Sequence, residues 1–236
     1  MEALIFVLIL VAVAAGVIYA FVQKQKRREA LAVFALQNKL DYSRADPFDL
    51  TDDAFHLFGL GDGRGCENVM WGDWHGLSVK EADYWYYTES TDSEGHTSRS
   101  YHHFSVVLAD LPATLPPVSI EKEKLLTRLA DALSFHDIDF ELEEFNRLFQ
   151  IRAADREFAY KLIDARMMRW LLSTQGSFGF EVNGPSLLVW CGRLRPTGLV
   201  PLFGSAALFR DHIPRLVWSE YGTGSPASPE GERSTS

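Results

Sequence analysis

The hydrophobic and polar positions of the first 40 residues divide them into an apolar run and a basic, helix-forming segment. Residues 3–22 carry no charge, and as a helix rising about 1.5 Å per residue they span roughly 30 Å, the hydrocarbon thickness of a bilayer. Residues 23–40 lack Gly and Pro, so we expect the helix to continue as a stalk. The pattern predicts a single transmembrane helix from Ala3 to Val22. The stalk residues expected to share one apolar face are Leu31, Phe34, Ala35 and Leu40.

A buried core helix and a cleaved signal peptide are the two alternatives for the apolar run. Core helices of soluble domains seldom run this long without a polar face. Ala12-Val13-Ala14 resembles a cleavage site, but Glu2 is the only charge before the run, and the run is longer than a typical signal core. We therefore favour a retained membrane anchor.

The charges beside the span predict its orientation. Four cations follow it directly and none precedes it, so the positive-inside rule places the short N-terminus outside and the C-terminal region in the cytoplasm. We also expect these cations to face anionic headgroups, with a solvated helix start as the alternative. They are Lys24, Lys26, Arg27 and Arg28.

After the stalk, runs rich in aromatic and β-branched residues indicate antiparallel strands. We expect strands over 66–74 and 77–89 around a tight turn at His75-Gly76, a polar loop over 90–98 and a third strand over 99–111. The prolines of residues 112–117 suggest an extended connector, which leads to a short strand at 118–120.

Leucines at helical spacing predict a helix over Glu121–Phe135. Residues 136–143 then alternate, which predicts a strand with Ile138, Phe140 and Leu142 on one face. Its other face would carry four carboxylates, which suit Ca²⁺ or a basic partner, although a solvated edge strand also uses such charge. These are Asp137, Asp139, Glu141 and Glu143.

The C-terminal third predicts a strand, helices and a hairpin. We expect a strand over 145–151 and helices over 155–162 and 164–172, with Asp155 and Asp164 as N-caps. The remaining elements are a hairpin of strands 178–182 and 187–190 turning at Asn183-Gly184-Pro185, a helix from Pro196 to His212 that buries Leu199, Phe203, Ala206 and Phe209, and a disordered tail over 222–236. The expected fold class is α+β, a mostly antiparallel sheet with several packed helices over 41–221.

Charge and cysteine content narrow the possible partners. The whole chain carries a net charge of −9. Because residues 1–40 contribute +3, residues 41–236 carry −12. An acidic body has no general attraction for phosphates, so we expect no nucleic acid partner. Two distant cysteines, Cys66 and Cys191, form no zinc pattern and agree with a reducing compartment.

Candidate chemistry is sparse. The alternating glycines of residues 59–65 lack both common phosphate-loop patterns, so we expect a flexible loop. His102 and His103 would face opposite sides of a strand and would make a poor joint metal site. Trp85 and its neighbouring tyrosines could form an aromatic platform for bases or sugars, but core packing is the default. The sequence thus assigns no catalytic, cofactor-binding or metal-binding residue.

Two segments resemble an uncharacterised bacterial family of membrane-anchored proteins. They are Cys66–Gly72 ahead of an aromatic strand, and Glu144–Ile151 with Asp155, Ala159 and Arg166-Met167-Met168 after it. The resemblance covers roughly residues 45–218. It implies an N-terminal span and an α+β domain with an F-x-x-x-F element (Phe145, Phe149), and it supplies no catalytic residues.

The sequence leaves three functional hypotheses. We favour a non-enzymatic interaction module that is tethered at the cytoplasmic face and binds a protein partner of unknown identity. The second is a membrane-tethered, hydrolase-like enzyme, which would need a cleft that combines a carboxylate of raised pKa with His102 or His103. The third is an extracytoplasmic domain.

Overall fold

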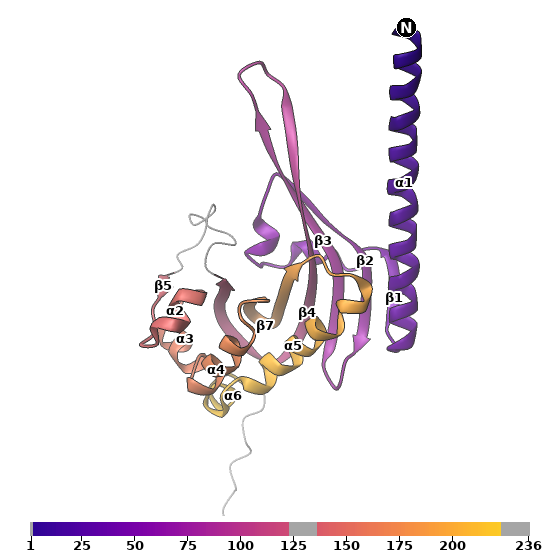
Figure 1. Cartoon of the computed structure of the whole chain (residues 1–236). Coiled ribbons are helices and arrows are strands. Elements are labelled where there is room, and N and C mark those ends of the chain that lie inside the picture. The colour runs from indigo at the N-terminus through magenta and orange to yellow at the C-terminus, as the bar shows by residue number, and fades with distance from the viewer. Residues whose placement is uncertain (1, 123–135, 223–236) are drawn as a thin grey trace, which may run out of the picture. The chain divides into compact units, whose positions relative to one another are not determined.

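The computed structural model describes residues 2–122 and 136–222. Its strands form a seven-stranded, mostly antiparallel sheet in the order β1-β2-β3-β4-β6-β5, and β7 pairs with β4 (Figure 1). Together with the helices this confirms the expected α+β class. The strands are β1 (Asp41–Ala45), β2 (Gly63–Asp73), β3 (Ser78–Thr91), β4 (Thr97–Lys122), β5 (His136–Ile138), β6 (Phe149–Ala153) and β7 (Gly179–Gly192).

Six α-helices and three short 3-10 helices accompany the described strands. The α-helices are α1 (Glu2–Gln37), α2 (Glu143–Leu148), α3 (Arg156–Leu162), α4 (Ala165–Ser173), α5 (Val200–His212) and α6 (Arg215–Tyr221). The 3-10 helices are η1 (Leu50–Asp52), η2 (Leu57–Gly59) and η3 (Pro196–Gly198). The contacts divide the chain into two compact units, the first over 1–107 and 190–204 and the second over 108–189 and 205–236.

The first unit contains α1, in which the apolar run and the stalk form one helix as expected, although it ends at Gln37 and not at residue 40. The apolar half is long and apolar enough to cross a membrane, and none of it is buried in the protein. The stalk half packs on the unit, and the expected apolar face is buried. The exposed fractions of the four residues of this face are 0% for Leu31, 8% for Phe34, 1% for Ala35 and 7% for Leu40.

The turn between β2 and β3 confirms the predicted hairpin. His75 and Gly76 both have positive φ, at 52° and 77°, as a two-residue type I′ turn requires. Trp74 and Leu77 close the turn through paired backbone hydrogen bonds of 2.8 and 3.1 Å. Gly63 already belongs to β2, so the expected flexible loop over 59–65 is shorter than predicted.

The second unit confirms both predicted N-caps. The Asp155 carboxylate accepts a hydrogen bond from the Phe158 amide, and that of Asp164 accepts two, from Arg166 and Met167. The centre of the Trp170 ring of α4 lies 5.5 Å from that of Phe180, and Trp170 stacks on His212 at the end of α5. The helix predicted over 196–212 is correct apart from its first residues, which form η3, and the four residues expected to be buried are 0% exposed.

The expected connector over 112–117 is wrong, because β4 continues through it. Proline and the residue before it both favour extended backbone, so the segment keeps strand geometry. Leu111, Ala113 and Leu115 are buried while Pro112 and Thr114 are exposed, which is the period of two of a strand. The helix predicted from Glu121 is wrong at its start, since 121 and 122 end β4, and 123–135 lie outside the described residues.

Two strand predictions near residue 140 are correct only in part, since 136–138 form β5 and 149–151 belong to β6. The predicted strand 136–143 ends at Ile138, because the Asn146 side chain bonds the backbone N and O of Phe140, at 2.9 and 2.6 Å, in place of a neighbouring strand. The predicted strand 145–151 begins instead as the helix α2. A helix of six residues is too short for its apolar period to be distinguished from that of a strand.

The predicted hairpin at Asn183-Gly184-Pro185 is wrong, since β7 runs continuously from Gly179 to Gly192. A type I′ turn needs two residues with positive φ, and here only Gly184 has one, at 59°. A single left-handed glycine is typical of a bulge. The strand β1 and the helix α6 were not predicted, and the tail from 223 onward lies outside the described residues.

Candidate functional site at the foot of the anchor helix

The first turns of α1 after the predicted span are joined to the sheet by a partly buried arginine. Arg27 Nε donates to Asp83 Oδ2 at 2.7 Å, and Nη2 donates to the other carboxylate oxygen. Arg27 Nη1 donates to the backbone oxygen of Leu194, also at 2.7 Å. The planar guanidinium suits this two-point contact with a carboxylate, which fixes direction as well as distance.

Asp83 is the centre of the cluster, and its side chain is only 4% exposed. Besides Arg27, it accepts hydrogen bonds from Arg193 Nη2 at 3.1 Å and from Asn68 Nδ2 at 2.9 Å. The Tyr42 hydroxyl donates to Asn68 Oδ1 at 3.0 Å. Side chains from α1 and β2 and from the residue after β7 therefore converge on one carboxylate of β3, and Tyr42 of β1 reaches it through Asn68. We call these five residues the anchor joint.

The charges of the anchor joint support one another. Burial alone would raise the pKa of Asp83, but the hydrogen bonds and charges of Arg27, with Arg193 and Asn68, lower it below its ordinary value. Burial works against the charge of Arg27 as well, yet Asp83 raises the pKa of its guanidinium. The pair is therefore fully ionised at neutral pH.

Glu81 lies two residues before Asp83, on the same face of β3. Its side chain is fully buried, and neither carboxylate oxygen has a hydrogen-bond partner among the described residues. Burial, and then the negative charge of Asp83, raise the pKa of Glu81 well above its ordinary value. The pKa values of two acids on one strand face are thus shifted in opposite directions, which their different surroundings determine.

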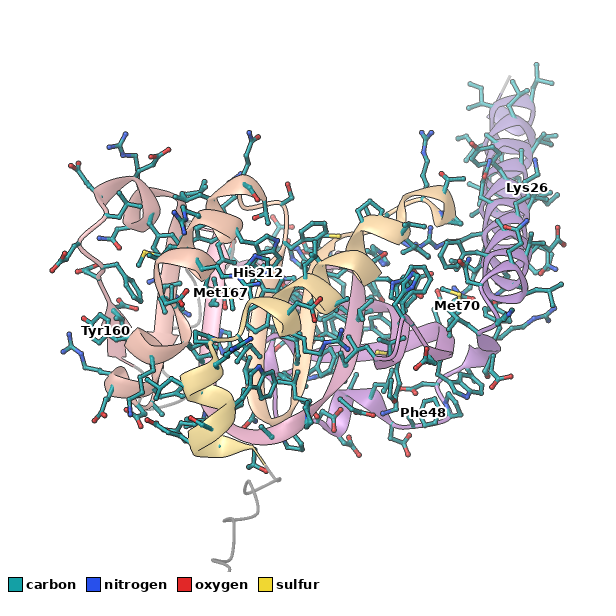
Figure 2. All side chains as sticks on the ribbon, turned by 90° about the horizontal axis from the view of Figure 1, so that it is seen from below. Lys26, Phe48, Met70, Tyr160, Met167 and His212 are labelled. Atoms are coloured by element: carbon teal, nitrogen blue, oxygen red, sulfur yellow. The ribbon has the colours of Figure 1, made fainter. Side chains whose placement is uncertain are left out.

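Three of the four cations after the span pair with acids of the sheet. Lys24 Nζ lies 2.7 Å from Glu67 Oε2, and Arg28 Nη2 lies 3.7 Å from the same atom. Arg27 is bound to Asp83, while the expectation that these cations face headgroups stays a prediction. Lys26 is exposed on α1 (Figure 2).

The histidine and acidic candidates remain dispersed. His102 stacks on Tyr86 at 4.7 Å and His103 on Tyr101 at 6.2 Å, so the two rings lie on opposite faces, as predicted. Asp137 Oδ1 lies 3.5 Å from Arg152 Nε, and Glu143 belongs to α2 and not to a strand. The predicted strand face with four carboxylates therefore does not form. Within residues 2–122 and 136–222, no three His, Cys, Asp or Glu side chains are placed to hold a metal ion.

Cys66 and Cys191 are free thiols. Burial is the main cause that raises the pKa of both thiols, to about 12 for Cys191. A thiol of such pKa is protonated at neutral pH, so both side chains are poor nucleophiles.

The enzyme hypothesis requires a cleft in which a carboxylate of raised pKa lies beside His102 or His103. The carboxylate is Glu81, but it is 0% exposed and has no reach to a substrate in this conformation. A hollow of about 300 Å³ in the first unit is lined by Phe48, Trp71 and Lys80 among others. There Lys80 Nζ lies 5.5 Å from the centre of the Phe48 ring, a packing contact rather than a catalytic arrangement.

Sequence reasoning did not find the anchor joint, although one signal points to it. Glu81 and Asp83 share their strand face with Val79 and Trp85, so two acids interrupt an otherwise apolar row. A buried acid needs a basic or hydrogen-bonding partner, and the stalk is the segment of the chain in which basic residues are concentrated.

Comparisons with known proteins support the fold. No family model and no curated protein matches this chain, which agrees with the resemblance to an uncharacterised family. A solved structure that is similar is the crystal structure of the mycobacterial trehalose monomycolate transport factor A, TtfA. The TM-score is 0.60 at 14% sequence identity, over 80% of this chain and 95% of that chain. At this identity the likeness shows the fold alone, and the chain is a membrane-anchored α+β protein with that fold.

Proposed function

We propose that this chain is a single-pass membrane protein whose body binds a protein partner at the cytoplasmic face and that it has no catalytic activity of its own. The anchor joint is the observation that carries this proposal. Arg27 follows the span by five residues, and its three nitrogens are bonded to β3 and to Leu194. The first unit is therefore held directly against the end of the anchor rather than on a free linker, as a docking platform at a membrane requires.

The structural neighbour supports a more specific form of the proposal. TtfA is described as a mycobacterial trehalose monomycolate transport factor. We propose that this chain likewise assists a membrane transporter of an envelope lipid, as an accessory protein that contacts the transporter and leaves the lipid chemistry to it. The partner is then an integral membrane protein rather than a soluble one.

Affinity purification of the full-length protein from detergent-solubilised membranes tests the partner. We expect a membrane protein to copurify reproducibly with the wild type. A matched variant replaces residues 3–22 with an unrelated apolar span and leaves the body intact. Copurification retained in this variant supports binding through the body, whereas its loss assigns the contact to the span. Absence of any companion, together with substrate turnover by the pure protein, would contradict the proposal.

Thiol labelling in intact cells tests the proposed orientation. Cys66 and Cys191 are poor reporters because they are half-buried and their pKa values are raised. Arg169 is exposed on α4, so Arg169→Cys offers a better site. We expect an impermeant maleimide to label this variant only after lysis. Labelling before lysis would place the body outside the cell and favour the extracytoplasmic alternative.

A further inference from the structure

The hairpin of β3 and β4 carries an aromatic face that the anchor joint does not use. The centres of the Trp85 and Tyr87 rings lie 6.3 Å apart in a stacked arrangement, and that of Tyr101 lies 5.9 and 5.4 Å from them. Tyr101 is 52% exposed and the other two side chains are half-buried. We call these three residues the aromatic face, and Figure 1 shows that the hairpin that bears them extends beyond β2.

Two glycines of β2 open the space in which these rings lie. Gly63 pairs with Tyr87 and Gly65 with Trp85. A β-carbon at Gly63 would lie 2.5 Å from the Tyr87 ring, and one at Gly65 would lie 3.0 Å from the Trp85 ring. The rings therefore spread over the backbone of β2 instead of standing upright, which widens the apolar surface.

The contacts of α1 show which way β3 runs relative to the anchor. Leu40, after the end of α1, lies beside Gly72, which pairs with Val79, whereas Arg27 contacts Asp83. Moving toward the N-terminus of α1 thus moves toward the hairpin tip along β3. Trp85, Tyr87 and Glu89 continue the strand face of Asp83, which is the face that Arg27 of α1 contacts.

The aromatic face consequently lies at the level of the bilayer surface. Arg27 is five residues beyond Val22, or about 7 Å along the helix from the end of the predicted span. Trp85 is two residues beyond Asp83, or about 7 Å along the strand in the same direction. Trp85 therefore reaches the interface between hydrocarbon and headgroups, where Trp and Tyr are enriched in membrane proteins.

The hairpin tip determines how this face is directed. Residues 88–98 read TESTDSEGHTS, which cannot enter hydrocarbon. A tip of this composition belongs outside the hydrocarbon, and Figure 1 shows the hairpin leaning away from α1. Leaning in that direction turns the α1-facing side of the hairpin, which holds the aromatic face, toward the bilayer. Arg99, whose guanidinium lies 4.6 Å from the Tyr87 ring centre and pairs with Glu89 at 2.7 Å, borders it on the tip side.

We infer that the aromatic face rests in the lipid interface as a second membrane contact beside the anchor. This inference depends on the membrane anchoring within the proposed function, but not on the partner or on the orientation. The contact restricts rotation of the first unit about α1, because the sheet is then held at the bilayer both through the anchor joint and through the hairpin.

Fluorescence quenching of the full-length protein in phosphatidylcholine vesicles tests this inference. Part of the lipid carries bromine near the headgroup end of its acyl chains, and bromine quenches only tryptophans close to it. Trp85→Phe keeps an aromatic ring, and Trp71→Phe is the matched control. Trp71 pairs with Lys80, three residues before Asp83, and packs on Phe48, so it lies further from the span.

The chain has six tryptophans and none in α1. We expect the lipid-quenched fraction of the emission to fall by about half or more in Trp85→Phe and to stay unchanged in Trp71→Phe. An unchanged fraction in Trp85→Phe overturns the inference and leaves the aromatic face for a protein or a sugar. Unchanged near-ultraviolet circular dichroism shows that each variant is folded. Purification of a partner is a separate measurement, so the inference and the proposed function can fail independently.

Discussion

Replacement of Arg27 by methionine removes the guanidinium of the anchor joint and keeps an apolar stem of similar length. Asp83 then loses two hydrogen bonds and its strongest positive neighbour, and retains Arg193 at 3.1 Å and Asn68 at 2.9 Å. Removal of one partner from a buried ion pair costs about 3–5 kcal/mol, because the other charge stays buried. Since two contacts remain, we expect the lower end, about 3 kcal/mol, or roughly 10 °C in Tm for a chain of this size.

Thermal unfolding of the full-length protein in detergent at neutral pH, followed by near-ultraviolet circular dichroism, measures this change. Lys24→Met is the matched control, because Lys24 is 48% exposed and Glu67 is 23% exposed, and such pairs contribute less than about 1 kcal/mol. Adding Asp83→Asn to Arg27→Met removes a buried charge that Arg193 alone then balances, so the double variant is expected to regain about 2 kcal/mol. An Arg27→Met protein within about 0.5 kcal/mol of the wild type would refute the structural role of the joint.

Three further predictions concern a buried acid, a glycine and a helix cap. The pKa of Glu81 is raised, so the folded state keeps a proton that the unfolded state releases above about pH 4.3. The free energy of unfolding of the wild type therefore falls as pH rises from there toward the pKa of Glu81 in the folded state, by at most about 1.4 kcal/mol per pH unit. Urea titrations at several pH values measure this slope, and Glu81→Gln is expected to make it smaller. Gly61 and Gly95 both have positive φ, but only at Gly61 would a β-carbon meet backbone, at 2.5 Å, so Gly61→Ala is expected to lower Tm more than Gly95→Ala; equal losses would contradict the packing. Asp164→Ala removes an N-cap with two hydrogen bonds and is expected to cost about 1 kcal/mol by chemical denaturation, with no loss arguing against the cap.

Local signals in the sequence predicted the elements that local forces decide. The apolar run and its uninterrupted stalk predicted α1, the His75-Gly76 pair predicted the turn of the first hairpin, and Asp155 and Asp164 predicted two helix starts. In each case the residues that fix the backbone are adjacent in sequence, so no distant contact was needed.

The elements that the sequence did not predict depend on distant or unusual contacts. β4 runs through Pro112 because its alternate residues are buried by neighbouring elements, and β5 ends early because the Asn146 side chain takes over the backbone bonds of Phe140. The anchor joint combines residues 56 and 110 positions from Asp83 in sequence, Arg27 and Arg193. The spacing of residues along the sequence does not indicate that such distant residues are in contact.

Alkaline carbonate extraction of membranes tests most directly the claim on which the account rests, that α1 crosses the bilayer and carries the body with it. The span holds no charge over residues 3–22, and its insertion is favourable by several kcal/mol, on the order of 0.3–0.6 for each large apolar residue. We predict that the intact chain stays in the pellet at high pH while a variant without residues 2–22 appears in the supernatant. Release of the intact chain, with its N-terminus present, would contradict the anchor and with it the proposed platform.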